Sequence, residues 1–279
     1  MLNIFPAVSS GLLLAFARTL WSYGTIAEVY TLNTLLIVTI IFLITRWRRR
    51  ILEDPRWTHG KSGKPTITDH DGPLYAAAIT FGLALGVHHV TVGLLLPALA
   101  VIVFRTQGPK FFRSRRLIYA ALISLGALFA VDSYLPLAAS VDPLINWGNP
   151  RSLQAIWWHI TGRQYQVFFS FSPAMLGDEF RKFVDLLLSE FGRPWLSLAL
   201  ICALFGYVSV FRRDRTTFWL LVLIVVFNLS YTLCYDIAED KDTYHLPSSY
   251  PLPSPVVSGC VKYYNYFQPE YAISQLPYY

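Results

Sequence analysis

The sequence predicts an all-α polytopic membrane protein, and three observations support this fold class. Hydrophobic residues make up 54% of the chain and charged residues only 14%, a departure from globular composition in the direction of membrane proteins. Several apolar stretches approach the roughly 20 residues that are needed to cross about 30 Å of hydrocarbon. Lysine and arginine gather in three clusters between these stretches, as expected of loops on the cytoplasmic side of a membrane.

Four apolar stretches are predicted to be membrane-spanning helices, and a fifth is a candidate. The four are residues 29–45, 117–139, 195–211 and 217–235, and the candidate is residues 4–20. The candidate lacks the basic start and the small-residue cleavage site of a signal peptide.

The basic clusters predict the direction of each span. They lie in residues 46–64, 105–116 and 212–215. If all three are cytoplasmic, residues 74–104 begin and end inside and must cross twice. Gly86-Val87-His88-His89 interrupts this stretch near its middle. We therefore expect two short, tilted helices that meet near the histidines, because such broken segments occur where backbone lines a protein cavity.

Residues 140–194 are then a long external loop that is predicted to carry interfacial helices. Apolar residues follow helical spacing in 180–191 and charged residues fill the other face, a pattern typical of a helix that lies in the membrane interface. Aromatic residues in 157–171 suit the same headgroup depth. The segment 146–150, Asn-Trp-Gly-Asn-Pro, predicts a turn into a helix whose N-cap is Ser152.

Residues 1–246 are predicted to form one transmembrane domain of about six to seven spans, and residues 247–279 an unstructured Pro- and Tyr-rich tail. We expect the chain to be an incomplete piece of a larger membrane protein. Its net charge of +6 is explained by topology and by anionic lipid headgroups. A membrane lipid is therefore the expected partner, and no nucleic-acid partner is expected.

Glu28 lies directly before the first predicted span after the N-terminal candidate. A carboxylate at membrane depth is costly and should face a wet cavity or a partner. This makes Glu28 a candidate for the wall of a catalytic site. The equal alternative is a glutamate at a helix N-terminus, where the macrodipole favours it.

His88 and His89 are the next candidates. Adjacent histidines point to different faces of a helix and make a poor two-ligand metal site, so we expect a metal-free contact with a phosphate or a hydroxyl. The alternative is one histidine satisfied by the backbone and one in the headgroup zone.

Arg151 and Arg163 are expected on the external side, beside the aromatic residues. The planar guanidinium fork matches phosphate, so either arginine could hold a lipid-linked phosphate; ordinary headgroup contact is the competing interpretation. Asp132 could pair with one of them or lie at an exposed helix end. The acidic residues of 236–242 could bind a divalent cation, but a solvated loop is favoured and no metal or cofactor is expected.

Four segments resemble one family in their order and spacing. They are LWSYGTIAEVYTLN (20–33), GLALGVHHVT (82–91), NWGNP (146–150) and TGRQY (161–165). The family is domain-of-unknown-function family 2723, whose multi-spanning members resemble GT-C type protein O-mannosyltransferases. The resemblance covers roughly residues 5–247.

The resemblance implies a GT-C-like helical bundle that transfers a sugar such as mannose. The donor would be a polyprenyl-phosphate sugar, a substrate rather than a cofactor, and the acceptor a hydroxyl of a protein or glycan on the non-cytoplasmic face. The catalytic residues it implies are Glu28, His88 and His89; the substrate-binding residues are Tyr30, Asn33, Trp147, Arg163 and Tyr165.

Two departures from the family pattern predict an inactive fragment. GT-C enzymes usually carry an essential acidic residue in the first external loop, and this chain is expected to begin after that loop. Later spans are also missing beyond Pro247. The alternative functions are a transporter or flippase-like protein without transferase activity, which the interruption at 86–89 favours, and a non-catalytic scaffold. The bacterial inner membrane is the preferred location because the external loops carry no disulfide pattern; in a eukaryote it would be the endoplasmic reticulum membrane.

Overall fold

The computed structural model describes residues 4–53, 70–190, 196–237 and 241–249. These ranges are helical and hold no strand, only an isolated bridge between Phe169 and Tyr235, so the predicted fold class is confirmed. Within them, four helices are long and apolar enough to cross a membrane: Tyr30–Glu53, Gly72–Gly93, Arg115–Ser140 and Arg215–Cys234. The protein is therefore an integral, multi-pass membrane protein.

The chain divides into two compact units. The first unit comprises Met1–Glu28, Pro173–Leu233 and Glu239–Tyr279, and the second comprises Val29–Ser172 and Cys234–Ala238. Each unit gathers segments that are far apart in the sequence, so neither was evident from the order of the apolar stretches.

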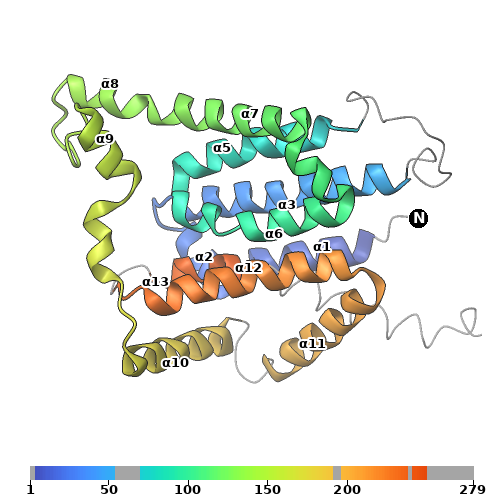
Figure 1. The fold of residues 1–279 in the computed structure, drawn as a ribbon. Helices are drawn as coiled ribbons and strands as arrows, with labels where there is room; N and C mark the ends of the chain where they lie inside the picture. Colours follow the sequence, from blue (N-terminus) through green and yellow to red (C-terminus); the bar gives the residue numbers. More distant parts are fainter. Residues whose placement is uncertain (1–3, 54–69, 191–195, 238–240, 250–279) are drawn as a thin grey trace, which may run out of the picture. The chain divides into compact units, whose positions relative to one another are not determined.

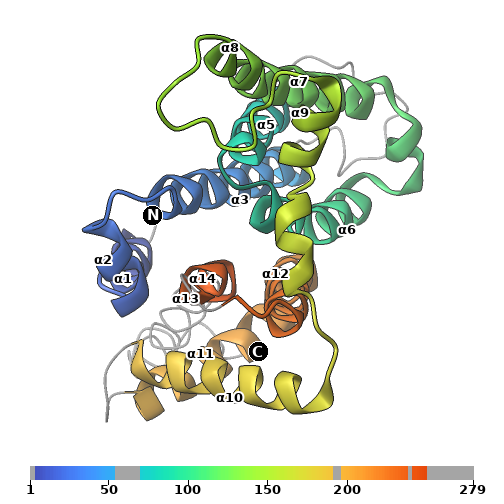
Figure 2. The ribbon, with the colours of Figure 1, turned by 90° about the vertical axis from the view of Figure 1, so that its left-hand side faces the viewer.

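The second unit is built around three long helices. They are α3 (Tyr30–Glu53), α5 (Gly72–Gly93) and α7 (Arg115–Asp132), which α8 (Tyr134–Ser140) continues. Helix α5 lies between α3 and α7 (Figures 1 and 2). On α3 the buried apolar residues recur at helical spacing, and they are Ile37, Ile40, Ile44, Trp47 and Ile51. This spacing gives α3 one continuous face to pack inward.

Two glycines let α5 approach α7 closely. A Cβ built on Gly82 would overlap the backbone carbonyl oxygen of Ser124, and one on Gly86 would lie 2.5 Å from Cγ1 of Val131. The pair has the small-xxx-small spacing of close helix contacts in membranes. Gly86 therefore belongs to the packed, helical part of the interrupting segment 86–89.

The interruption predicted at 86–89 is confirmed at one residue. His88 has non-helical angles, φ −154° and ψ 84°, inside α5. The helix nevertheless continues to Gly93, and the chain reverses only at Leu94 and Leu95 before α6 (Leu96–Gln107) begins. The stretch thus forms a helical hairpin as expected, but its turn lies past the histidines.

One end of the second unit is basic, and we call it the basic end. It includes the C-terminal part of α3, the start of α5, and the short helix η1 (Pro109–Arg113) that leads into α7. The rings of Trp47 and Phe111 are 5.6 Å apart, and Arg116 pairs with Asp71. These contacts place the described part of the first basic cluster beside the second, as expected if both clusters are cytoplasmic. Arg56, Lys61 and Lys64 of the first cluster lie outside the described residues.

The opposite end of the second unit carries α9 (Leu153–Ile160) and η2 (Arg163–Phe168) (Figure 1). The predicted N-cap is confirmed, because the Ser152 hydroxyl accepts a 3.1 Å hydrogen bond from the Ala155 N–H. The predicted aromatic residues are largely exposed: Trp157 by 64%, Phe171 by 72%, and Trp158, Tyr165, Phe168 and Phe169 by 37–40%. Exposed aromatic side chains at this end are consistent with contact at headgroup depth.

The first unit contains α1 (Ile4–Ala15), α2 (Arg18–Gly24), α10 (Pro173–Ser189), α11 (Leu196–Arg213), α12 (Arg215–Cys234), α13 (Lys241–Tyr244) and α14 (Leu246–Ser249). The candidate span at 4–20 is not a single helix, since Ala17 is extended (φ −60°, ψ 131°) between α1 and α2. The start of the predicted tail, 247–249, is helical, and residues 250–279 lie outside the described part of the chain.

Helix α10 is the amphipathic helix predicted within the long loop. Its Glu179 is buried and forms ion pairs with Lys182 on the same helix and with Lys241 of α13. Burial would raise the pKa of Glu179, but the two ammonium groups lower it overall. A paired carboxylate therefore ties α10 to α13 within the first unit.

Candidate functional site

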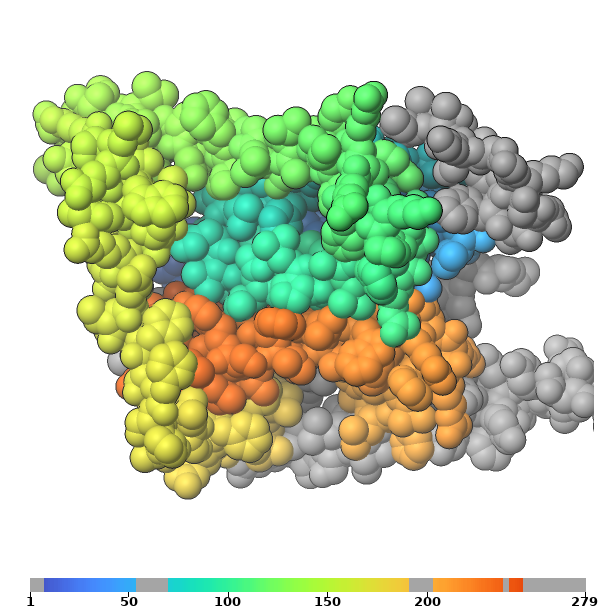
Figure 3. Space-filling model, viewed as in Figure 1, coloured from blue at the N-terminus to red at the C-terminus, as the bar shows by residue number. Residues whose placement is uncertain are grey.

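Polar side chains gather at the end of the second unit that lies opposite the basic end. We call this the histidine end, because it contains His88, His89 and His159. Its residues come from the start of α3, the end of α5, the end of α7, and α9 with η2. Figure 3 shows α9 and η2 on the surface beside the end of α5.

The break at His88 turns its ring toward the start of α3. The ring centroids of His88 and Tyr30 are 6.0 Å apart, with the ring planes inclined by 45°. In a regular helix the side chain of residue 88 would lie along the helix surface. The non-helical backbone at His88 therefore determines the direction of its side chain. Two residues that the resemblance assigned to the site are thus neighbours.

A hydrogen-bonded chain continues from His88 into the helix packing. The Asn33 amide donates to the Thr91 hydroxyl at 2.9 Å, and that hydroxyl lies 3.1 Å from Nδ1 of His88. Asn33 and Thr91 are 3% and 2% exposed. When the Thr91 O–H donates to Nδ1, the proton of the neutral imidazole lies on Nε2, which becomes a donor.

His89 points to a different environment from His88. It is exposed, and a Cβ on Gly162 would lie 3.7 Å from its Nε2. Gly162 has φ +57°, a left-handed conformation that glycine adopts without strain. Asp132 at the end of α7 interacts electrostatically with both His89 and His159. The charged groups that act on Asp132 are thus these histidines, and neither Arg151 nor Arg163 is among them.

A cavity of about 490 Å³ lies beside His159. Its lining residues are Trp147, Gly148, Ala155, Trp158, His159, Arg163 and Gln164. Nδ1 of His159 is buried and has no hydrogen-bond partner among the described residues. A buried imidazole nitrogen without a partner is costly, so this atom is available to bind a polar group of a ligand.

Arg163 is held at the mouth of this cavity by an aromatic ring. Its guanidinium carbon lies 4.1 Å from the centre of the Trp158 ring, a cation–π contact that leaves the N–H groups free to bind an anion. Arg151 differs: it forms an ion pair with Asp142 and donates from Nε to the Ala139 carbonyl at 2.8 Å. Arg151 is therefore a structural residue of the loop, and Arg163 remains the phosphate candidate.

Most of the residues predicted from the sequence meet at the histidine end. Tyr30, Asn33 and His88 form one group; Trp147 and Arg163 line the cavity, and Tyr165 lies against Gly162 as His89 does. Glu28 is exposed and is the last residue of the first unit, so its catalytic role stays a prediction.

Sequence reasoning missed three residues of the site. His159 was not singled out, although it follows Trp157 and Trp158 in the helix that Ser152 was expected to cap. Thr91 and Gly162 appeared only as parts of longer motifs. The signal that could have identified Gly162 is a glycine that directly precedes a charged residue. A glycine in the left-handed conformation often ends a helix and sets the direction of the next side chain.

The described ranges hold no group of three or more His, Cys, Asp or Glu side chains that could bind a metal ion. Glu239 and Asp240 of the acidic stretch lie outside those ranges. The side chains of the histidine end can form hydrogen bonds, transfer a proton through imidazole, and bind an anion through arginine.

The fold and the site define a class: a multi-span helical membrane protein with a polar, aromatic cavity at one end of a helix bundle. Residues 1–111 match the family model of the N-terminal domain of protein O-mannosyl-transferase TMEM260. Comparisons with curated proteins and with solved structures give no match. The family match includes the segments 20–33 and 82–91, while the resemblance of 146–150 and 161–165 lies beyond it.

Proposed function

We propose that this protein is a GT-C type glycosyltransferase, or part of one. It would move a sugar, with mannose as the first candidate, from a polyprenyl-phosphate donor to an acceptor hydroxyl on the non-cytoplasmic face. The family match supports O-mannosyl transfer as the reaction class. The observation that carries the proposal is the cavity at the histidine end, where Arg163, Trp158 and His159 meet.

The cavity offers one group for each part of such a donor. Arg163, held over Trp158, would bind the phosphate. The faces of Trp147 and Trp158 would pack against the sugar ring, and the unpaired Nδ1 of His159 would bind a sugar hydroxyl or a phosphate oxygen. The volume of about 490 Å³ lies within the range of small-molecule sites.

In the transfer step, the acceptor oxygen bonds to the anomeric carbon as the bond from that carbon to the phosphate oxygen breaks. The lipid phosphate leaves with the bonding electrons, and Arg163 would stabilise its charge. The acceptor proton passes to a general base. Within the second unit the candidate for this base is His89, which interacts with Asp132; Glu28 stays the candidate that the sequence resemblance implies.

Asn33 and Thr91 would position the side chain of His88 for this reaction. The chain from Asn33 through Thr91 to His88 would fix the imidazole, and a Thr91 O–H that donates to Nδ1 would leave the ring proton on Nε2. A donor fixed in this way costs little reorganisation when it binds a charged oxygen. We assign His88 to donor phosphate or acceptor hydroxyl binding.

The test uses the purified full chain in lipid nanodiscs, with radiolabelled polyprenyl-phosphate mannose and hydroxyl-bearing acceptor peptides. We expect donor binding that Arg163→Gln weakens by about 10- to 100-fold, the loss of one charge-assisted contact. Arg49→Gln is the matched control, because Arg49 is an exposed arginine paired with Glu53 on α3. Acceptor labelling coupled to release of lipid phosphate would support the enzyme.

The non-helical backbone at His88 also suits a transporter, since such breaks line substrate pathways in membrane carriers. The same preparation in sealed vesicles separates the two functions. Movement of the lipid-linked sugar across the bilayer without acceptor labelling would favour transport. Absence of donor binding in wild-type protein would contradict both.

A further inference from the structure

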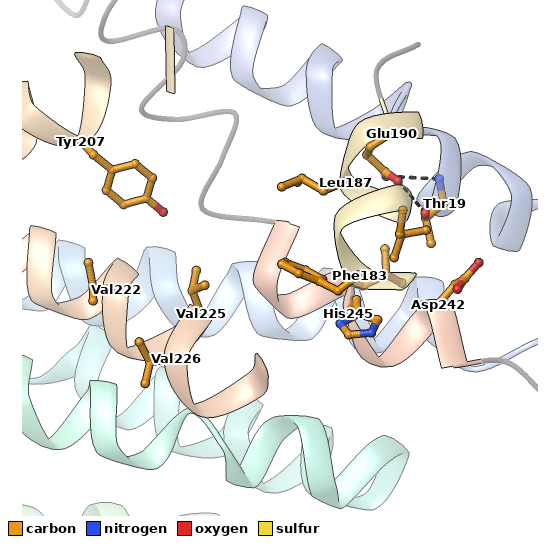
Figure 4. Close-up of a pocket in the computed structure, with 12 residues that line it drawn as sticks. Thr19, Phe183, Leu187, Glu190, Tyr207, Val222, Val225, Val226, Asp242 and His245 are labelled. Atoms are coloured by element: carbon orange, nitrogen blue, oxygen red, sulfur yellow. Dashed lines mark hydrogen bonds between the residues drawn. The ribbon is translucent and has the colours of Figure 1, made fainter. Parts of the chain in front are cut away.

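The first unit contains a second cavity, which the proposed function does not use. Its volume is about 300 Å³, and it is lined by residues of α2, α10, α11, α12 and the α13–α14 segment (Figure 4). Its wall is almost entirely apolar: Phe183, Leu186 and Leu187 come from α10, and Val222, Val225 and Val226 from α12.

The polar groups of this cavity lie together at one end. Figure 4 shows Glu190, Thr19, His245 and Asp242 on the same side, with Tyr207 across from them. Glu190 already has partners, because its carboxylate accepts from the Thr19 hydroxyl at 2.6 Å and from the Thr19 N–H at 3.2 Å. This contact fixes the end of α10 to the first turn of α2.

At this end of the cavity, His245 has a ring nitrogen without a hydrogen-bond partner among the described residues. The residue is 5% exposed, its ring lies 5.1 Å from that of Phe183, and its Nδ1 has no hydrogen-bond partner among the described residues. Buried polar atoms are nearly always hydrogen-bonded in native proteins. An unpaired imidazole nitrogen on the wall of an apolar cavity therefore indicates a ligand with one polar atom.

We propose that this cavity binds the hydrocarbon chain of a lipid with an uncharged hydroxyl head group, which hydrogen-bonds to His245. The apolar wall of α10 and α12 selects the chain. Asp242 at the polar end disfavours an anionic head by like-charge repulsion, and Glu190, whose pKa burial raises, adds no cation that would attract one. Such a lipid differs from the polyprenyl-phosphate donor in its head group, so the inference goes beyond the proposed function and does not rest on it.

The size of the cavity limits the length of the hydrocarbon chain that it can hold. An engineered apolar cavity of about 150 Å³ holds one benzene molecule, and this cavity is about 300 Å³. By that comparison it holds roughly a dozen carbon atoms. A single medium-length chain, or the head-proximal part of a longer one, fits; a two-chain phospholipid does not.

The experiment is photolabelling of the full chain in phosphatidylcholine nanodiscs. The probe is a twelve-carbon alcohol with a diazirine in the chain, and labelled peptides are identified by mass spectrometry. We expect saturable labelling of the α10 and α12 segments around Phe183 and Val225, displaced by unlabelled dodecanol. Probes of equal length with a carboxylate or a phosphate head should label these segments at least about tenfold less.

Two pairs of variants test the cavity and its polar end. Val225→Trp fills the cavity and should reduce alcohol labelling about tenfold or more. Phe227→Trp is the matched control, since Phe227 is exposed on the same helix and does not line the cavity. His245→Leu should reduce labelling about tenfold, and His245→Gln, which keeps hydrogen-bonding groups, should restore most of it.

Gel filtration of each variant shows that the protein is folded. Unchanged labelling in Val225→Trp would overturn the proposal, because the probe would then bind elsewhere. Equal labelling by the anionic probes would overturn the assignment of an uncharged head. These outcomes are independent of sugar transfer, which the Arg163 variant tests.

Discussion

Arg116 of α7 forms a bidentate ion pair with Asp71, the residue directly before α5. The guanidinium donates from both Nε and Nη2 to the carboxylate, and the side chains are 13% and 2% exposed. The Trp47 indole donates to the same carboxylate at 3.1 Å. One buried aspartate thus joins α3, α5 and α7 at the basic end, which makes that end a fixed structure.

Asp71→Asn should therefore destabilise the second unit strongly. The substitution leaves the Arg116 charge buried without its counterion, a change that costs about 3–5 kcal/mol. Thermal unfolding in detergent measures it. The control is Glu53→Gln, because the Arg49–Glu53 pair is 69% and 61% exposed and solvent screening should leave stability nearly unchanged. Equal effects of the two variants would contradict a structural role for Asp71.

Gly82→Ala should separate α5 from α7. Its new Cβ would overlap the Ser124 carbonyl oxygen, which is backbone and cannot move aside like a flexible side chain. We expect a loss of stability of about 1–3 kcal/mol. Gly126→Ala on α7 is the matched control, since its Cβ meets no atom within 4 Å, and it should be neutral or stabilising because alanine favours helix. A Gly82→Ala protein as stable as wild type would show that the helices do not pack this closely.

Thr91→Val should test the chain from Asn33 to His88. Valine keeps the shape but removes the hydroxyl, so the buried Asn33 amide loses its acceptor and His88 loses its donor. The expected cost is about 1 kcal/mol, typical of hydrogen bonds between membrane helices. Thr91→Ser, which retains the hydroxyl, should lose less. If serine and valine have the same effect, the hydroxyl is not part of the packing.

His245 should make the first unit less stable as the pH falls. Burial lowers the pKa of His245 from 6.5 to about 4, so the unfolded chain binds more protons between these values. Stability is thus fully present above pH 6.5 and is lost as the pH falls toward 4. Between pH 7 and 5 the linkage corresponds to about 2 kcal/mol.

The difference between wild type and His245→Leu isolates this effect from its neighbours. Lys182 and Lys241 lower the pKa of Glu179, whereas burial raises the pKa of Glu190 against its hydrogen bonds to Thr19. Both carboxyl groups titrate in either protein. Denaturant unfolding of the two proteins at pH 7 and 5 should show a steeper pH dependence in wild type; parallel profiles would show that His245 is solvated.

The helices and their caps were predictable from the sequence because they depend on local properties. Length and hydropathy locate α3, α7 and α12, amphipathic spacing locates α10, and Ser152 caps α9 as expected. The Asp71–Arg116 pair and the fit of Gly82 against α7 were not predicted. Both depend on contacts between residues more than 40 positions apart, which spacing along one helix does not reveal.

The candidate site was predictable only in part, from the types of its residues. The motif residues Tyr30, Asn33, His88 and Arg163 were singled out by residue type, and the fold brings them to one end of the second unit. His159 was missed because its role depends on the pocket formed by the 146–164 segment. The position of the break at His88, inside a helix that continues to Gly93, also depends on tertiary packing.

The central claim is that the basic end and the histidine end of the second unit face opposite sides of the membrane. It is tested most directly by cysteine accessibility in sealed, oriented vesicles, after replacement of Cys202, Cys234 and Cys260 by serine. A single cysteine at position 113 should react with a membrane-impermeant maleimide only from the cytoplasmic side, and one at position 89 only from the other side. Reaction of both from the same side would contradict the account.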